Sequence, residues 1–186
     1  CGPTGIGFLW SRKEILEKIP PLFGGGEMIQ DVFEETSTWA ELPHKFEAGT
    51  PAIAEAIGLA EAINYINTIG LNEIHEYEKT ITKYLFEKLN QIENIEIIGP
   101  SPEIDPDRAS LATFYIKNIH SNDIAEILDS KGICIRSGHH CCQPLHRYIG
   151  IKSTARISMN FTTNKEEIDM FIEKLKDTID FLKINS

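Results

Sequence analysis

Short apolar runs alternate with helical segments from residue 95 onward, and this alternation constrains the fold more than any other feature. A helix with Ser121 as its N-cap and Gly132 as its end is expected between two of the runs. The last helix is expected to begin with a capping box, Thr163–Glu166. Runs of strand length occur at 95–100, 110–116, 133–136 and 153–161. The alternation of these elements favours an α/β or α+β layer.

The start of the chain is less regular. The apolar residues at 6–10 predict a short strand, and a short helix is expected over 11–20. Residues 21–51 contain three consecutive glycines and no sustained period. An irregular stretch of that length inside a compact domain is usually functional.

Two long helices are expected to follow. Thr50 is a good N-cap and Pro51 suits the first helical position, so the first helix is predicted from Thr50 to Ile69. Gly70 then supplies a stop. Apolar residues spaced by three and four predict the second helix from Asn72 to Asn90.

Composition and charge exclude several classes of partner. The 186 residues carry a formal net charge of −10, and 41% of them are hydrophobic. An acidic chain is a poor ligand for nucleic acid or for anionic membranes, because both attract basic surfaces. No apolar stretch approaches the roughly 18 residues of a membrane span. Four cysteines without the spacing of a secreted framework favour reduced thiols in a cytosol-like compartment.

The run "RSGHHCCQPLHR", residues 136–147, concentrates the reactive side chains. A zinc site is the first alternative, but tetrahedral sites prefer two separated ligand pairs. Here His139, His140, Cys141 and Cys142 are contiguous and no second pair occurs elsewhere, so we expect no metal. A disulfide between the two adjacent cysteines is also disfavoured, because redox motifs prefer two intervening residues.

A nucleophilic cysteine is the third interpretation of this run. A thiol reacts as its thiolate, which positive or hydrogen-bond-donating neighbours stabilise. Arg136 precedes the cysteines and Arg147 follows them, while Gly138 and Pro144 indicate a loop. The spacing alone leaves this interpretation and that of inert thiols equally supported.

The run closely resembles the R-[ST/A]-G-H-H-C-x-x-P segment of group II, SUF-type cysteine desulfurases of the class V aminotransferase superfamily. Further blocks follow the family's order: "GPTGIGFLW", "PPLFGGGEMI", "STWAELPHKFEAGTPAIAEAIGLAEAINYI" and "TARISMNFTTNKEEID". The resemblance implies an incomplete type I pyridoxal-phosphate-dependent transferase fold, of the α/β class. Residues 1–65 would be the C-terminal part of the large cofactor-binding domain. Residues 66–186 would be the small α+β domain that carries the nucleophile loop.

The resemblance also implies an activity. Members of the family use pyridoxal phosphate to remove sulfur from L-cysteine, which gives L-alanine and a persulfide on the cysteine that corresponds to Cys141. The sulfur then serves iron–sulfur cluster assembly. Cys142 stands where the family tolerates small residues. A selenocysteine lyase is an alternative, and a non-catalytic module that binds a sulfur acceptor or a metal is another.

Further roles carry over residue by residue. Arg156 in "TARIS" corresponds to the arginine that holds the substrate carboxylate, and a planar guanidinium suits that task. Arg136 would bind substrate or order the loop. His139 and His140 would tune the loop. By the same resemblance, Gly49 and Thr50 in "FEAGTP" would reach across a homodimer to the phosphate of the partner subunit's cofactor, where a helix start is a suitable anion seat.

The family's Schiff-base lysine belongs to a "S-G-H-K-x-x-G-P-T-G" stretch, and "GPTG" begins here at residue 2. That lysine would therefore lie just upstream of Cys1, and Lys13 and Lys18 are no substitutes. We expect the chain to be the C-terminal portion of a longer enzyme and to be inactive alone. Its expected partners are a second copy and a small sulfur-acceptor protein, in the cytoplasm or in an organelle stroma.

Overall fold

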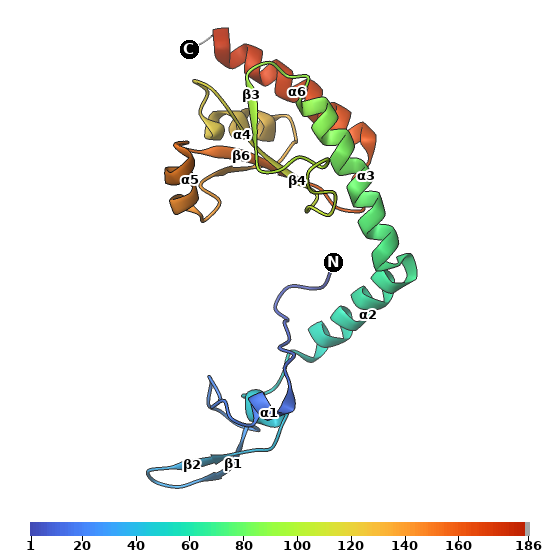
Figure 1. Cartoon of the computed structure of the whole chain (residues 1–186). Coiled ribbons are helices and arrows are strands. Elements are labelled where there is room, and N and C mark those ends of the chain that lie inside the picture. Colours follow the sequence, from blue (N-terminus) through green and yellow to red (C-terminus); the bar gives the residue numbers. More distant parts are fainter. Residues whose placement is uncertain (185–186) are drawn as a thin grey trace. The chain divides into compact units, whose positions relative to one another are not determined.

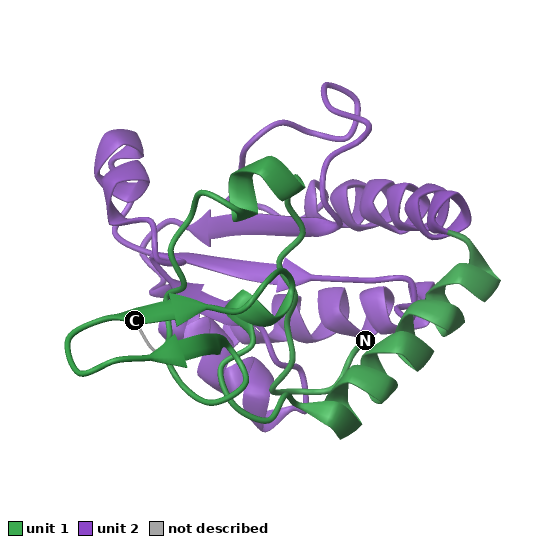
Figure 2. Ribbon diagram, turned by 90° about the horizontal axis from the view of Figure 1, so that it is seen from below, with its two compact units in different colours: residues 1–70 green, residues 71–186 purple. Residues whose placement is uncertain are grey.

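The computed structural model describes residues 1–184, which form two compact units (Figure 2). The first unit is Cys1–Gly70, and the second begins at Leu71. The predicted assignment of 1–65 to a large domain and 66–186 to a small one stays a prediction. No helix in the described part of the chain has the length and apolar character that a membrane span requires.

The first unit contains a short helix, a hairpin and one long helix (Figure 1). Its elements are α1 (Lys13–Leu16), β1 (Ile29–Val32), β2 (Ser37–Trp39), the 3-10 helix η1 (His44–Phe46) and α2 (Ile53–Ile69). Strands β1 and β2 pair antiparallel. The predicted irregular stretch 21–51 therefore holds a hairpin, whose turn is closed by the bond from the Phe33 N–H to the Thr36 carbonyl.

The predicted strand at 6–10 does not form. No described segment pairs with its backbone, and an unpaired strand has no ladder to hold it. Phe8, Leu9 and Trp10 are mostly exposed in this unit.

The predicted start of the first long helix is also wrong. Helix α2 begins at Ile53, and its N-cap is Ala52, which offers no side-chain hydrogen bond. Thr50 lies too far upstream to cap it, because Ala52 has a ψ of 79°, outside the helical range. The first N–H groups of α2 therefore receive no hydrogen bond from the Thr50 side chain.

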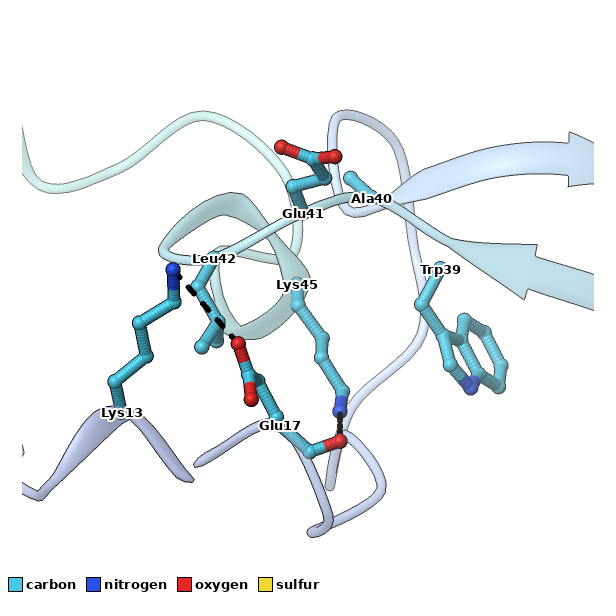
Figure 3. Close-up of a pocket in the computed structure, with 7 residues that line it drawn as sticks. All are labelled: Lys13, Glu17, Trp39, Ala40, Glu41, Leu42 and Lys45. Carbon is cyan, nitrogen blue, oxygen red and sulfur yellow. Dashed lines mark hydrogen bonds and ion pairs between the residues drawn. The ribbon is translucent and has the colours of Figure 1, made fainter. Parts of the chain in front are cut away.

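A buried lysine fastens α1 to the 3-10 helix η1, in the pocket that Figure 3 shows. The Lys45 amine donates to the carbonyls of Leu16 and Glu17, each at 3.1 Å. These carbonyls lie at the C-terminal end of α1, where backbone acceptors have no helical partner. The amine is thus engaged in structure, and the pocket holds no cluster of reactive groups.

The second unit is an antiparallel sheet packed against helices. Its strands lie in the order β3-β4-β6-β5. The bounds are α3 (Leu71–Leu89), β3 (Ile95–Ile98), β4 (Leu111–Ile116), α4 (Ser121–Ser130), β5 (Arg136–Gly138), α5 (Gln143–Ile149), β6 (Thr154–Ser158) and α6 (Lys165–Ile184). This mixed layer confirms the predicted α/β class, and the predicted strands at 95–100, 110–116 and 153–161 are present.

The core lies between this sheet and the helices α3, α4 and α6. Strand β4 alternates strictly, with Ala112, Phe114 and Ile116 buried and the residues between them partly exposed. That period of two places one face of the strand against the helices. Ala155 of β6 belongs to the same core.

Three local predictions need correction. The N-cap of α4 is His120, whose side chain accepts from the Asn122 N–H, and Ser121 is already helical. The capping box of α6 is Asn164 with Glu167, one residue after the predicted pair. In both cases the predicted cap is the immediate neighbour of the observed cap, and two adjacent side-chain acceptors are hard to tell apart from sequence.

The third correction concerns the cysteine run. The predicted strand 133–136 is displaced to Arg136–Gly138, because Ile133 packs in the core as the chain leaves α4. The predicted loop after the cysteines is helix α5, which has a proline in its first turn. Proline is tolerated there because that N–H lacks a helical partner in any case.

Candidate functional site

Two arginines meet on neighbouring strands of the second unit. Arg136 of β5 is paired directly with Arg156 of β6 in the antiparallel ladder. Like charges directly opposite each other destabilise a sheet. An anion beside them would offset that repulsion, so the pairing favours an anion site at this position.

Strand β6 orients Arg156 away from the core. Ala155 belongs to the hydrophobic core, and successive side chains of a strand point to opposite faces. Thr154 and Arg156 therefore share the face away from the helices. The Nε atom of Arg156 is buried and has no hydrogen-bond partner among the described residues. A buried donor without a partner is unfavourable, and a guanidinium can donate to an anion.

The cysteine turn follows β5 directly. Gly138 has a φ of +107°, His140 of +52° and Cys141 of +61°. Two consecutive non-glycine residues in the left-handed region are strained, and such strain persists only where the surroundings impose it. The N–H of Cys142 closes the turn on the His139 carbonyl at 2.8 Å. The result presents Cys141 at the surface, immediately before α5.

The arginine of β5 reaches the sulfur. The Arg136 Nη2 donates to the Cys141 Sγ at 3.1 Å. Cys141 is thus exposed and in contact with a cationic hydrogen-bond donor.

The histidines divide into one that is exposed and two that are held inside. His139 is exposed, and its ring meets that of His146 edge-on at 5.3 Å between centroids. His140 is half-buried, and its Nε2 lies 2.8 Å from the Thr154 Oγ1. Burial lowers the pKa of His140 below its ordinary value, and the charges of Arg156 and Arg136 lower that pKa further.

Sequence reasoning missed two residues of this site. His146 and Thr154 are both buried, and the His146 Nε2 lies 3.0 Å from the Thr154 Oγ1. Two spacings carried a weak signal. Thr154 precedes Arg156 by two, which places both on one face of a strand. His146 follows Cys142 by four, which is one helical turn.

Other chemistry at the cysteines finds less support in the geometry. All four cysteines of the chain are free thiols, and Cys142 is exposed like its neighbour. Within residues 1–184, no three His, Cys, Asp or Glu side chains converge as a metal site would need.

The first unit holds Gly49 and Thr50 in a pocket of its own. This pocket is also lined by Gly5–Phe8, by Glu27 and Glu47, and by residues of α2 between Ala56 and Ile63. Gly49 has a φ of +80°, and a Cβ added there would meet no atom within 4 Å. The backbone at Gly49 is therefore open to a bound group, and Thr50 is exposed beside it.

Comparison with known protein families gives one match over most of the chain. The profile of the family described as "Aminotransferase class-V" matches residues 1–171. A "Probable cysteine desulfurase" of Synechocystis sp. is 53% identical over 181 residues. A protein of the same name from Staphylococcus aureus is 48% identical over 180 residues. Each alignment covers 97% of this chain and 43% of the relative, so the chain spans less than half the length of these curated relatives.

Solved structures give the same picture. The cysteine desulfurase CsdA from Escherichia coli, in an S-sulfonic acid form, aligns with a TM-score of 0.87 at 29% identity. The apo cysteine desulfurase from Thermococcus onnurineus NA1 aligns with a TM-score of 0.88 at 37% identity. The alignments cover 97% and 96% of this chain, and 44% of each solved chain.

Proposed function

This chain belongs to the aminotransferase class-V family, and we propose that it is part of a pyridoxal-phosphate-dependent cysteine desulfurase. The reaction would take sulfur from L-cysteine, giving L-alanine and a persulfide on Cys141. The observation that supports this most directly is the exposed Cys141 sulfur, which accepts a hydrogen bond from Arg136 at 3.1 Å. The names of the relatives and of the solved structures support the same activity.

Cys141 is the proposed nucleophile. Its thiolate forms a bond to the sulfur of the substrate, and the bond between that sulfur and the substrate's β-carbon breaks. The electron pair stays on the carbon, which takes up a proton and ends as the methyl group of alanine. Pyridoxal phosphate, when bound, supplies the electron sink that this cleavage needs. The exposure of Cys141 then allows the persulfide sulfur to pass to an acceptor protein.

Arg156 is the proposed partner of the substrate carboxylate. Its unpartnered Nε and its pairing with Arg136 both favour an incoming anion. Arg136 binds the Cys141 sulfur and adds to the positive potential at the substrate. We assign His140, with its lowered pKa, to ordering the turn, and the exposed His139 to tuning it from outside.

Three features of the first unit support a phosphate site. Gly49 leaves open space at its backbone, Thr50 offers an exposed hydroxyl, and the first N–H groups of α2 lack helical partners. We propose that these groups hold the phosphate of the cofactor in the partner subunit of a homodimer. The proposed acceptor is a small protein of iron–sulfur cluster assembly. Four free, exposed thiols support a reducing compartment, either the cytoplasm or an organelle stroma.

The test is the reaction itself in the full-length protein loaded with pyridoxal phosphate. With L-cysteine and a reductant, it should form alanine and sulfide in equal amounts. Cys141→Ser should abolish both, while the matched variant Cys142→Ser should keep them. Equal activity of the two serine variants, or alanine formation without Cys141, would exclude the proposed mechanism.

A further inference from the structure

The hydroxyl of Thr154 joins the two internal histidines of the cysteine turn. Its Oγ1 lies 2.8 Å from the His140 Nε2 and 3.0 Å from the His146 Nε2. The other ring nitrogen of His146, Nδ1, lies 3.0 Å from the backbone carbonyl of Cys142. These contacts form one chain: Cys142 carbonyl, His146, Thr154 and His140.

The position of each proton in this chain follows from its fixed end. A carbonyl oxygen can only accept, so the Nδ1 of His146 carries the proton and donates to Cys142. The Nε2 of a neutral His146 is then an acceptor, and the single proton of the Thr154 hydroxyl points to it. The Gly138 carbonyl competes for that proton, but at 3.5 Å it is the longer contact.

The last step fixes the tautomer of His140. Because the Thr154 hydroxyl proton is used on His146, its oxygen accepts from His140, which must carry its proton on Nε2. The Nδ1 of His140 is then a bare acceptor. This Nδ1 is buried with no hydrogen-bond partner among the described residues. Burial and two nearby arginines keep the ring neutral by lowering its pKa.

This chain of hydrogen bonds contacts the turn on both sides of the proposed nucleophile. It binds the ring of His140 and the carbonyl of Cys142, and Cys141 lies between these two residues. His140 and Cys141 both have positive φ, a conformation that needs such external support. The anchor is Thr154 on β6, two residues before Arg156 on the same face of the strand. Thr154 therefore ties the sulfur to the strand that carries the proposed carboxylate ligand.

We propose that Thr154 is a positioning residue, whose hydroxyl sets the His140 tautomer through His146 and holds Cys141 in register with Arg156. The catalytic consequence rests on the proposed desulfurase function, whereas the proton order does not. Thr154 would touch neither substrate nor cofactor. It would act by keeping the sulfur at the distance and direction that attack requires.

Nitrogen NMR of the histidine side chains tests the proton order without any activity. At about pH 8, where an ordinary histidine is neutral, His140 should show a protonated Nε2 and His146 a protonated Nδ1. The spectrum of Thr154→Val should lose this fixed pattern at His140. A protonated Nδ1 on His140 in the unaltered protein would overturn the proposal, whether or not the protein is a desulfurase.

Steady-state kinetics of the full-length protein with pyridoxal phosphate test the positioning role. Thr154→Val should lower kcat for L-cysteine about tenfold or more, with little change in KM, because geometry and not substrate binding is lost. Thr154→Ser keeps the hydroxyl and should restore kcat to within about twofold. Thr178→Val is the matched control, since Thr178 is buried in α6 and, among the described residues, its hydroxyl bonds the Lys174 carbonyl and the Lys131 amine.

The outcomes separate the two proposals. If the unaltered protein forms no alanine but shows the expected tautomers, the proposed desulfurase function is wrong and the proposed proton order still holds. Equal kcat for Thr154→Val and Thr178→Val would overturn the positioning role. A serine variant as slow as the valine variant, at equal folded content by circular dichroism, would overturn it as well.

Discussion

The Nη2 of Arg136 lies 3.1 Å from the sulfur of Cys141, five positions further along the chain. This contact links the edge strand β5 to the exposed Cys141 thiol. Removal of the guanidinium leaves the exposed sulfur without its cationic donor. We therefore expect Arg136→Ala to slow alkylation of Cys141 by iodoacetamide several-fold, to the rate of an ordinary exposed thiol.

Arg147→Ala is the control for that experiment, because Arg147 bonds Gln143 in the same region and not the sulfur. Mass spectrometry of the labelled peptide, with modification at Cys141 and Cys142 resolved by fragmentation, gives the two rates. Loss of reactivity in both arginine variants would show a general effect of positive charge instead of the direct contact.

The pKa of His140 gives the stability of the chain a defined dependence on pH. In the folded chain this pKa lies below the ordinary value of 6.5, chiefly through burial and then through Arg156, Arg136 and His146. Between the two values the unfolded chain binds more protons than the folded chain. The stabilisation is therefore fully present above pH 6.5 and is lost as the pH falls below it.

Urea unfolding at a series of pH values measures this dependence. His140→Gln removes the titrating group and keeps a donor for Thr154, so its unfolding free energy should fall less on acidification than that of the unaltered chain. His139→Gln, at the exposed neighbour, should follow the unaltered chain. A His140→Gln curve that falls as steeply as the unaltered one would contradict the prediction.

The turn around Cys141 could be predicted from sequence because the residues that form it are neighbours in the chain. Cys141, its preceding Arg136 and the glycine at 138 lie within one short segment, and their chemistry is local. The partnership with His146 and Thr154 could not be predicted, because it depends on tertiary structure. It forms only when β6 pairs with β5 and when α5 brings His146 to Thr154.

The errors in the fold have the same origin. Thr50 and Pro51 satisfy every local rule for a helix start, yet α2 begins at Ile53 because the chain is still turning at Ala52. The run 6–10 has strand composition but no described neighbour to pair with. Elements with a strong hydrophobic period, such as β4, α3 and α6, were predicted because the spacing of their apolar residues defines the face that packs.

The core of the second unit should be sensitive at Phe114. This side chain is fully buried at the centre of β4, between the sheet and its helices. Phe114→Ala should lower the free energy of unfolding by about 3–5 kcal/mol, since it removes apolar contacts and leaves a cavity. Lys117→Ala, just beyond the same strand and exposed, should change it by less than about 0.5 kcal/mol. Urea unfolding followed by far-ultraviolet circular dichroism measures both, and similar losses would contradict the assigned core.

We expect Lys45 to contribute more to the stability of the first unit than an exposed lysine would. Its amine is buried and donates to the carbonyls of Leu16 and Glu17, as Figure 3 shows for Glu17. Lys45→Met keeps much of the side-chain volume but leaves both acceptors without this donor. We expect a cost of about 1–3 kcal/mol, the usual penalty for buried polar groups without partners.

Hydrogen exchange locates that cost. In Lys45→Met, the amides of α1 and η1 should exchange faster, while those of the second unit keep their protection, because the broken bonds lie wholly within the first unit. Lys13→Met provides the comparison from the same pocket. Its amine is exposed and only 3.8 Å from the Glu17 carboxylate, and such surface pairs contribute less than about 1 kcal/mol. Unchanged exchange at α1 in Lys45→Met would mean that the helix is held by other contacts, and the role assigned to the buried amine would be wrong.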